Sequence, residues 1–209
     1  MTKYVLSLDG GGVRALASIV FLKKLEKNLG TPLHEKFDFF VGTSAGAVSC
    51  LAIAINQMDS TQLVKFWSRD NLRKILPDSS WEVRANNLRK TFGFRGQGSK
   101  YDGLGKVDLL KEYFEDKKMG ESTKPVCVLC YDVEKRKPVI LSNFNHPKLS
   151  VVDVANATTA APTYFPTAKV SDKYLIDGAI VANHPSLHGF VEAKKLYPKD
   201  KIKVLSVGT

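Results

Sequence analysis

Two patterns of apolar and polar positions alternate along this chain of 209 residues. Short runs that are almost continuously apolar indicate strands buried on both faces of a sheet. Longer segments with apolar residues three and four positions apart indicate helices with one buried face. The first pattern predicts strands at Tyr4–Leu8, Phe37–Val41, Val126–Tyr131, Pro138–Ser142, Tyr174–Ile176 and Ile202–Val207. The second predicts helices at Val13–Leu29, Ala47–Ile55, Val107–Phe114 and Val151–Ala161.

The alternation of strands with helices predicts the fold class. It favours an α/β protein whose central sheet is largely parallel and is covered by helices on both faces. The helix at Ala47–Ile55 is apolar on almost every side, so we expect it to be buried. Because the length fits one domain and the sequence shows neither repeats nor a linker, we expect a single domain over residues 1–209.

The segment Asp59–Lys106 departs from this regular pattern. It holds ten basic and five acidic residues, a net charge of +5, with aromatic side chains scattered among them. These aromatic residues include Trp67, Trp81, Phe92 and Phe94. Two interpretations stand side by side: a cap or insertion that lies over the site and faces an anionic substrate, or a solvated basic surface.

The overall composition is that of an ordinary globular protein and excludes a disordered chain. Apolar residues make up 44% and charged residues 25%. Lysine and arginine outnumber the acids by 31 to 21, and the formal charge of +10 favours a polyanionic neighbour such as nucleic acid or an anionic membrane. The chain opens directly on a strand, and no apolar run approaches the ~20 residues of a membrane span. We therefore expect a cytoplasmic protein without a signal peptide, at most peripheral to membranes.

Three cysteines, Cys50, Cys127 and Cys130, lie in apolar runs, which is typical of buried, reduced thiols. Cys127 and Cys130 form a C-x-x-C pair inside a predicted strand, whereas a redox pair is expected at the start of a helix. A zinc site would need two further ligands at suitable spacing, and none lies nearby. We expect structural thiols and no metal site.

The pentapeptide Gly42-Thr43-Ser44-Ala45-Gly46 is the sharpest chemical signal. It is a G-x-S-x-G that lies between a predicted strand and a predicted helix, the context in which this motif carries a nucleophilic serine. The turn projects the hydroxyl above the sheet, and the start of the following helix offers free N–H groups and a positive dipole end. Ser44 is therefore the candidate nucleophile, although a small-residue turn needed for close packing is the alternative.

A second glycine-rich turn, Asp9–Ala15, also connects a predicted strand to a predicted helix. Three consecutive glycines, Gly10, Gly11 and Gly12, allow the backbone to present N–H groups to an anion. The same run matches a dinucleotide fingerprint, which needs an acid at the end of the second strand. Glu35 and Asp38 instead precede or begin that strand, so an oxyanion loop explains more of the sequence than a pyrophosphate loop.

A serine hydroxyl needs a base, and histidines are scarce. His34 and His146 lie in turns, while His184 and His188 follow Asp177 in the order of a Ser-Asp-His triad but too soon after it. Asp177 ends a predicted strand before Gly178, which places its carboxylate at the edge of the sheet where chemistry gathers. Burial beside the serine would raise the pKa of that carboxylate and make it a usable base.

Taken in order, the turn Asp9–Arg14, the elbow Gly42–Gly46 and the tripeptide Asp177-Gly178-Ala179 resemble the motifs of the patatin-like phospholipase family. Segments between them also resemble the family, and these are Lys100–Gly103, Lys137–Ile140 and Ala157–Pro166. The resemblance covers nearly the whole chain. His184 departs from it, because plant patatins tend to carry asparagine there, and relatives usually continue with further helices beyond Thr209. We expect a fragment or a minimal form of the fold.

The resemblance implies a three-layer α/β/α fold and a lipid acyl hydrolase that needs no cofactor. It implies a Ser44–Asp177 catalytic dyad without histidine, an oxyanion hole formed by the Gly10–Gly12 amides, and Arg14 and His184 as candidate accessory residues. The expected partners are a lipid or phospholipid and an anionic membrane surface, and no nucleic acid. Two alternatives remain: a phosphate-binding module that uses the glycine loop, and an inactive interaction domain of the same fold.

Overall fold

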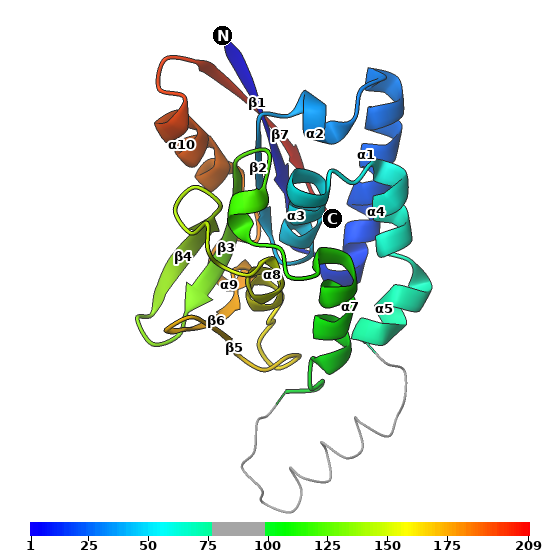
Figure 1. Ribbon diagram of the computed structural model, residues 1–209, viewed down its shortest axis with the longest axis vertical. Coiled ribbons are helices and arrows are strands. Elements are labelled where there is room, and N and C mark those ends of the chain that lie inside the picture. The colour runs from blue at the N-terminus through cyan, green and yellow to red at the C-terminus, as the bar shows by residue number, and fades with distance from the viewer. Residues whose placement is uncertain (77–98) are drawn as a thin grey trace, which may run out of the picture.

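The computed structural model describes residues 1–76 and 99–209, within which seven strands form one sheet flanked by helices (Figure 1). The strands are β1 Thr2–Leu8, β2 Phe39–Thr43, β3 Val126–Asp132, β4 Lys137–Ser142, β5 Ala168–Val170, β6 Lys173–Asp177 and β7 Lys201–Val207. The helices are α1 Ala15–Leu29, α2 Leu33–Lys36, α3 Ala45–Asn56, α4 Ser60–Phe66, α5 Arg69–Ile75, α7 Leu104–Phe114, α8 Val151–Thr158, α9 Ala179–Ala182 and α10 Ser186–Leu196, with 3-10 turns at Gly12–Arg14 and Met119–Glu121.

The strands on one side of the sheet pair in parallel, and those on the other side pair antiparallel. Its order is β5-β6-β3-β2-β1-β7, with β4 also paired to β3. The pairs β1–β7, β1–β2 and β2–β3 are parallel, as expected for strands joined through helices. The pairs β3–β4 and β5–β6 are antiparallel because each is joined by a short turn, and β6 also runs antiparallel to β3. The predicted α/β class is confirmed, with parallel pairing among the four consecutive strands β3, β2, β1 and β7.

Two strands share one edge of β3 and meet end to end. Strand β4 occupies one edge of β3 along Cys127–Asp132, so β2 and β6 must both lie on the other edge. Along that edge, Thr43 at the end of β2 pairs with Leu129, and Asp177 at the end of β6 pairs with the next residue, Cys130. The carboxyl ends of β2 and β6 therefore converge on one point of the sheet, although they lie far apart in the sequence.

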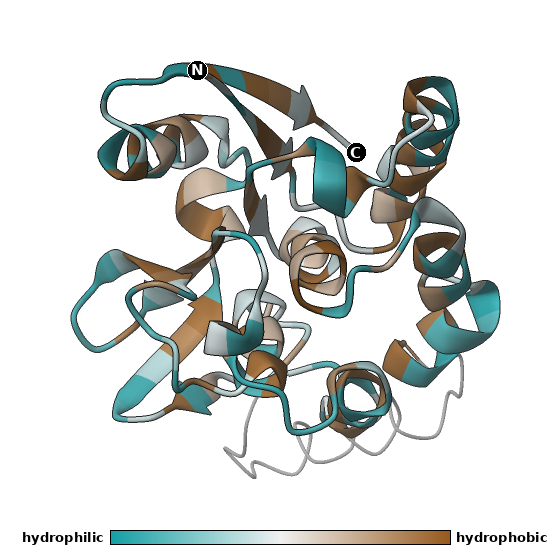
Figure 2. Ribbon diagram, turned by 45° about the horizontal axis from the view of Figure 1, so that its top comes forward, coloured by the Kyte–Doolittle hydropathy of each residue, from teal (hydrophilic) through white to brown (hydrophobic). Residues whose placement is uncertain are grey.

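Helices cover both faces of the sheet and give it three layers. Alternate strand residues such as Leu6 and Phe40 face a core built with α1, α3, α4, α7 and α8. Their neighbours Val5 and Phe39 face a smaller core built with α10. Burial on both sides explains why these strands are continuously apolar. Figure 2 shows the hydrophobic colours gathered on the central strands and α3, whose residues 45–55 are all buried as predicted.

Several predictions of element bounds needed adjustment. Helix α1 begins at Ala15 rather than Val13, since Gly12–Arg14 forms a 3-10 turn, and α8 ends at Thr158 because Pro162 cannot continue it. The elements α2, α4, α5, α9, α10 and β5 were not predicted, as most are short or lack a clear period. Trp81, Phe92 and Phe94 lie outside the described residues.

The three cysteines are buried free thiols, as predicted, and two of them lie in β3. Burial raises the pKa of each thiol well above its usual range. Among the helices that the structure describes, none has the length and apolar character needed to cross a membrane.

Candidate active site

Ser44 sits at the sharp turn between β2 and α3. Its backbone has φ 54° and ψ −128°, a strained conformation for a residue with a side chain. Flanking glycines make the turn sterically feasible: a Cβ on Gly42 would lie 2.5 Å from the Ala47 backbone, and one on Gly46 would lie 2.4 Å from the Leu8 carbonyl oxygen. The Ser44 amide donates a hydrogen bond of 2.9 Å to Thr158 Oγ1, so α8 helps to hold the turn. The predicted strand-turn-helix context of the motif is present.

Asp177 and Ser44 are brought together by the convergence of β6 and β2. The Ser44 hydroxyl donates to Asp177 Oδ2 at 2.6 Å, and the Ala179 amide donates to Asp177 Oδ1 at 2.8 Å. Asp177 is only 2% exposed. Burial raises the pKa of this carboxyl, and the hydrogen bonds from Ser44 and Ala179 together with the charge of Lys106 partly oppose that rise. The arrangement is a hydroxyl aimed at a carboxylate of enhanced basicity.

The glycine loop after β1 lies beside this pair and is held by Asn183. The Gly10 amide donates to the Asn183 carbonyl at 3.0 Å, and Asn183 Nδ2 donates back to the Gly10 carbonyl at 3.0 Å. Within the described residues, the amides of Gly11 and Gly12 have no acceptor. The predicted oxyanion donors thus narrow to Gly11 and Gly12, since the Gly10 amide is already engaged. Asn183 was not singled out from the sequence, because a lone asparagine in a loop carries no signal of its own.

The predicted accessory residues lie around the pair rather than on it. His184 Nδ1 is 2.6 Å from Asp9 Oδ2, and its side chain is 63% exposed. Arg14 is exposed and lines the mouth of the cavity described below. In the part of the chain that the structure describes, no histidine is hydrogen-bonded to Ser44 or Asp177. His184 instead links the glycine loop to the segment after β6.

Lys106 is a buried lysine that lines the same cavity as the pair, and the sequence analysis did not identify it as a site residue. Its side chain is 4% exposed, and Nζ donates to the carbonyls of Asn156 at 3.3 Å and Thr159 at 3.1 Å. Burial lowers the pKa of Lys106 to about 7, although the charge of Asp177 opposes that change. A signal existed: Lys106 precedes Leu109 and Leu110 by three and four positions, so it lies on the apolar face of α7.

A cavity of about 480 Å³ opens over Ser44 and Asp177. Its walls are largely apolar, and they come from α3, α4, α5, α7 and the segment after α8. Representative apolar lining residues are Val48, Phe66, Leu72, Ile75 and Leu110. The volume is that of a small-molecule pocket, and its lining suits a hydrocarbon chain. The described flanks of Asp59–Lys106 contribute Phe66, Leu72 and Ile75 to this wall, and the rest of that segment, on which the two interpretations depend, lies outside the described residues.

Comparison with known proteins gives one consistent result. Residues 6–188 match the family described as patatin-like phospholipase. A Pseudomonas aeruginosa protein named cGAMP-activated phospholipase is 33% identical over 100% of this chain and 62% of its own length. Patatin-like protein 2 of Arabidopsis thaliana is 32% identical over 88% of this chain and 50% of its own length. The chain therefore spans less than two thirds of these relatives.

A likeness to a solved structure concerns the fold alone. The crystal structure of VipD from Legionella pneumophila superposes with a TM-score of 0.57 at 16% identity, covering 86% of this chain and 46% of that one.

Proposed function

Because the chain belongs to the patatin-like phospholipase family, we propose that it is a lipid acyl hydrolase of the phospholipase A or lysophospholipase type. The observation that carries the proposal is the 2.6 Å hydrogen bond from the strained Ser44 hydroxyl to buried Asp177, at the floor of an apolar cavity. The lipid that it hydrolyses carries an acyl ester. The formal charge of +10 supports contact with an anionic membrane surface during the reaction.

The proposed reaction proceeds through an acyl-enzyme. Ser44 Oγ forms a bond to the ester carbonyl carbon while its proton passes to Asp177 Oδ2. The tetrahedral intermediate then expels the alcohol, and Asp177 returns the proton to the leaving oxygen. Water attacks the acyl-enzyme as Asp177 accepts one of its protons, and that proton returns to Ser44 Oγ as the carboxylic acid leaves.

Burial of Asp177 is what makes a carboxylate an adequate base in this scheme. A raised pKa brings the carboxyl closer to the working pH, where the balance between ionised fraction and basicity is best. The short hydrogen bond holds the two reacting oxygens in place before substrate arrives, so little reorganisation is needed. General-base catalysis of this kind contributes about 10²- to 10⁴-fold in rate.

The developing oxyanion would be bound by the amides of Gly11 and Gly12. Both are free of acceptors within the described residues, and the loop that carries them is fixed through Asn183. The start of α3 behind Ser44 adds a positive dipole end. Each such donor contributes about 10²- to 10³-fold in the systems where one has been removed. The apolar wall of the cavity would hold the acyl chain while the ester lies at Ser44.

Labelling with an uncharged, serine-directed alkyl phosphonate tests this proposal directly. Wild-type protein should form one covalent adduct on Ser44 and hydrolyse p-nitrophenyl acyl esters and a fluorescent phospholipid. Ser44→Ala should lose both properties. Absence of an adduct and of turnover in folded wild-type protein would instead support a phosphate-binding module or an inactive interaction domain.

Ser7→Ala provides a matched control for the loss of a buried serine. Ser7 lies in β1 with no exposed surface, and its hydroxyl has no hydrogen-bond partner within the described residues. Removing that hydroxyl should leave folding, labelling and hydrolysis unchanged. Equal loss in Ser7→Ala and Ser44→Ala would show that the assay reports the fold and not the nucleophile.

A further inference from the structure

Lys106 lies where few lysines are found, inside the wall of the cavity above Ser44 and Asp177. Only 4% of the residue is exposed. Gly105 makes this depth possible, because a Cβ there would lie 2.1 Å from the Lys74 carbonyl oxygen, so α7 approaches α5 very closely at its first turn. Burying an ammonium group is costly unless the site compensates for lost water. The groups around Nζ must therefore supply the hydrogen bonds that water would otherwise make.

The surroundings satisfy Lys106 in either protonation state. Nζ donates to the carbonyls of Asn156 and Thr159, which lie at the carboxyl end of α8. A neutral amine has two N–H donors, enough for these two acceptors, and an ammonium has a third. The ammonium form gains from the negative end of the helix and from the ring of Phe165, whose centroid is 4.2 Å from Nζ. Lys106 can thus gain or lose a proton while Nζ keeps both hydrogen bonds.

Lys106 and Asp177 line the same cavity, and the negative charge of Asp177 raises the pKa of Lys106 against the effect of burial. The other charged side chains on the elements packed against it are exposed. On α5 these are Arg69, Asp70, Arg73 and Lys74, and on α8 the corresponding residue is Asp153. On α7 itself they are Asp108, Lys111 and Glu112, and Glu112 pairs with Lys74 at 3.0 Å. Among nearby tyrosines, Tyr164 lines the cavity, Tyr101 packs against Phe165, and Tyr113 lies on α7. Solvent screens the exposed charges, so Asp177 dominates.

The helix end that holds Lys106 also holds the nucleophile. Thr158 accepts a hydrogen bond from the Ser44 amide and donates to the Leu129 carbonyl at 2.7 Å. The neighbouring carbonyl, that of Thr159, accepts from Lys106. Asp177 is tied to the same segment, because its amide donates to the Ala160 carbonyl at 3.1 Å. Residues 158–160 thus connect the nucleophile, its base and the buried cation in one rigid unit.

We propose that Lys106 is a positioning residue that acts on catalysis through Asp177: as an ammonium it holds that carboxylate ionised, and as a free amine it leaves the carboxylate a stronger base. The pKa of Lys106 is lowered by burial to about 7, so both forms are populated near neutral pH. The inference rests on the proposed function of Ser44 and Asp177. It assigns a second titrating group to the reaction, one that touches neither the substrate nor the reacting atoms.

The pH dependence of acylation separates this role from a structural one. The rate of Ser44 labelling by an uncharged phosphonate would be measured from about pH 4 to pH 9. Wild type should show two rises, one as Asp177 ionises and a second of about threefold to tenfold as Lys106 loses its proton near neutral pH, because the acylation rate follows the basicity of Asp177. Lys106→Arg should keep the first rise and lose the second, since a guanidinium stays charged throughout. Lys106→Met should show a single rise, displaced to higher pH.

Further variants distinguish the proposed role of Lys106 from a structural role and from substrate binding. Lys111→Met removes an exposed lysine from the same helix and should retain both rises. If Lys106→Met loses thermal stability but both rises stay in place, the residue merely caps α8 and the inference is wrong. If its effect is confined to a higher KM for phospholipid, with the phosphonate profile unchanged, Lys106 binds the headgroup and the inference is also wrong. Labelling of Ser44→Ala would overturn the proposed function itself, which is a separate failure.

Direct titration of Lys106 tests the proposal even if the Lys106→Arg variant does not fold. The side-chain carbon resonance of Lys106 would be followed by NMR in isotopically labelled wild type and in Asp177→Asn. Because coupling between two sites is reciprocal, removing the negative charge should lower the pKa of Lys106. An unchanged Lys106 titration in Asp177→Asn would contradict the proposed coupling.

Discussion

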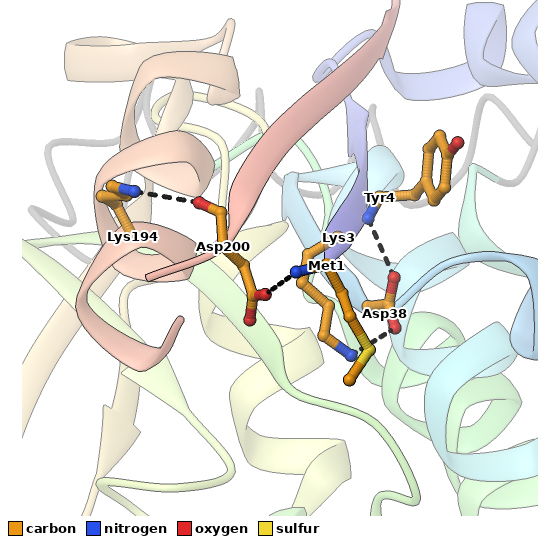
Figure 3. Close-up of polar contacts among 6 residues, drawn as sticks. All are labelled: Met1, Lys3, Tyr4, Asp38, Lys194 and Asp200. Atoms are coloured by element: carbon orange, nitrogen blue, oxygen red, sulfur yellow. Dashed lines mark hydrogen bonds and ion pairs between the residues drawn. The ribbon is translucent and has the colours of Figure 1, made fainter. Parts of the chain in front are cut away.

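The two ends of one sheet place the same kinds of charged side chain in opposite environments. At the amino ends of the strands, Lys3 pairs with Asp38 at 3.0 Å and the amino terminus pairs with Asp200 at 2.6 Å, in contact with solvent (Figure 3). At the carboxyl ends, Lys106 and Asp177 are buried. Hydrogen bonds to these partners raise the pKa of Lys3 and lower that of Asp200, whereas burial lowers the pKa of Lys106 and raises that of Asp177.

The difference shows which charged groups raise the free energy of unfolding and which lower it. Pairs at the amino end favour the charged forms, so they add modestly to stability. Groups at the carboxyl end are held in an environment that disfavours their charges, which costs stability and raises the pKa of Asp177. The strained backbone of Ser44 belongs to the same end. Four experiments test this contrast.

The largest expected effect is on catalysis. Asp177→Asn should lower kcat for ester hydrolysis by about 10²- to 10⁴-fold, because an amide cannot accept the Ser44 proton. The same substitution at the amino end, Asp38→Asn, should leave kcat unchanged. Steady-state kinetics on a p-nitrophenyl ester measure kcat for both variants. Comparable decreases in kcat would contradict the assignment of catalysis to the carboxyl end of the sheet.

The next largest effect is the loss of stability expected when a methyl group is added where the serine turn packs closely against β1. Gly46→Ala would place a methyl group 2.4 Å from the Leu8 carbonyl and 2.5 Å from that of Asp9. Strand β1 and helix α3 would have to separate, at a cost of about 1–3 kcal/mol or more in the free energy of unfolding. Urea denaturation measures this change in the free energy of unfolding. Gly208→Ala is the control, because its methyl group would meet only an ordinary contact of 3.5 Å to Asp9 Oδ2. Equal midpoints for the two variants would contradict the steric explanation.

A smaller effect concerns the stability of Asp177 variants as a function of pH. Since the folded pKa of Asp177 is raised above 3.8, the folded protein binds this proton more tightly than the unfolded chain does. Wild-type stability should therefore fall, relative to Asp177→Asn, as pH rises from 3.8 through the folded pKa, by at most about 1.4 kcal/mol per pH unit. Thermal unfolding between about pH 4 and pH 6 measures the gap. A wild-type free energy of unfolding that instead rises relative to that of Asp177→Asn over this range would show that the carboxylate is stabilised in its site.

The smallest effect is expected at the amino end. Lys3→Met removes the ion pair with Asp38 and should cost less than about 1 kcal/mol, reduced further at about 1 M salt. Because the folded pKa of Lys3 is raised, this contribution is present below pH 10.5 and is lost as pH rises through the folded value. Urea midpoints at low and high salt test it, and a loss that is insensitive to salt would indicate packing of the lysine stem instead.

Much of the fold could be predicted from the sequence because its signals are local. Apolar runs predicted six of the seven strands that the structure describes, and within the first predicted helix Ala15, Ile19 and Leu22 are buried on one face of α1. Helix α10 was missed because its exposed residues include Leu187, Phe190 and Val191 beside Lys194 and Lys195, so the sequence shows no clear division into an apolar and a polar face. The short strand β5 was missed because three residues make no pattern.

The sequence by itself determined the nucleophile candidate, because a G-x-S-x-G between strand and helix is defined by neighbours in the chain. It also marked Asp177 through its motif. Only the tertiary structure decided that these two residues meet, since β2 and β6 reach the same edge of β3 from opposite directions across 133 positions. The same holds for the support that Asn183 gives to the glycine loop and for the burial of Lys106. A pKa depends on burial and on charges that are distant in sequence, so the chemistry of this site is set by how the chain packs.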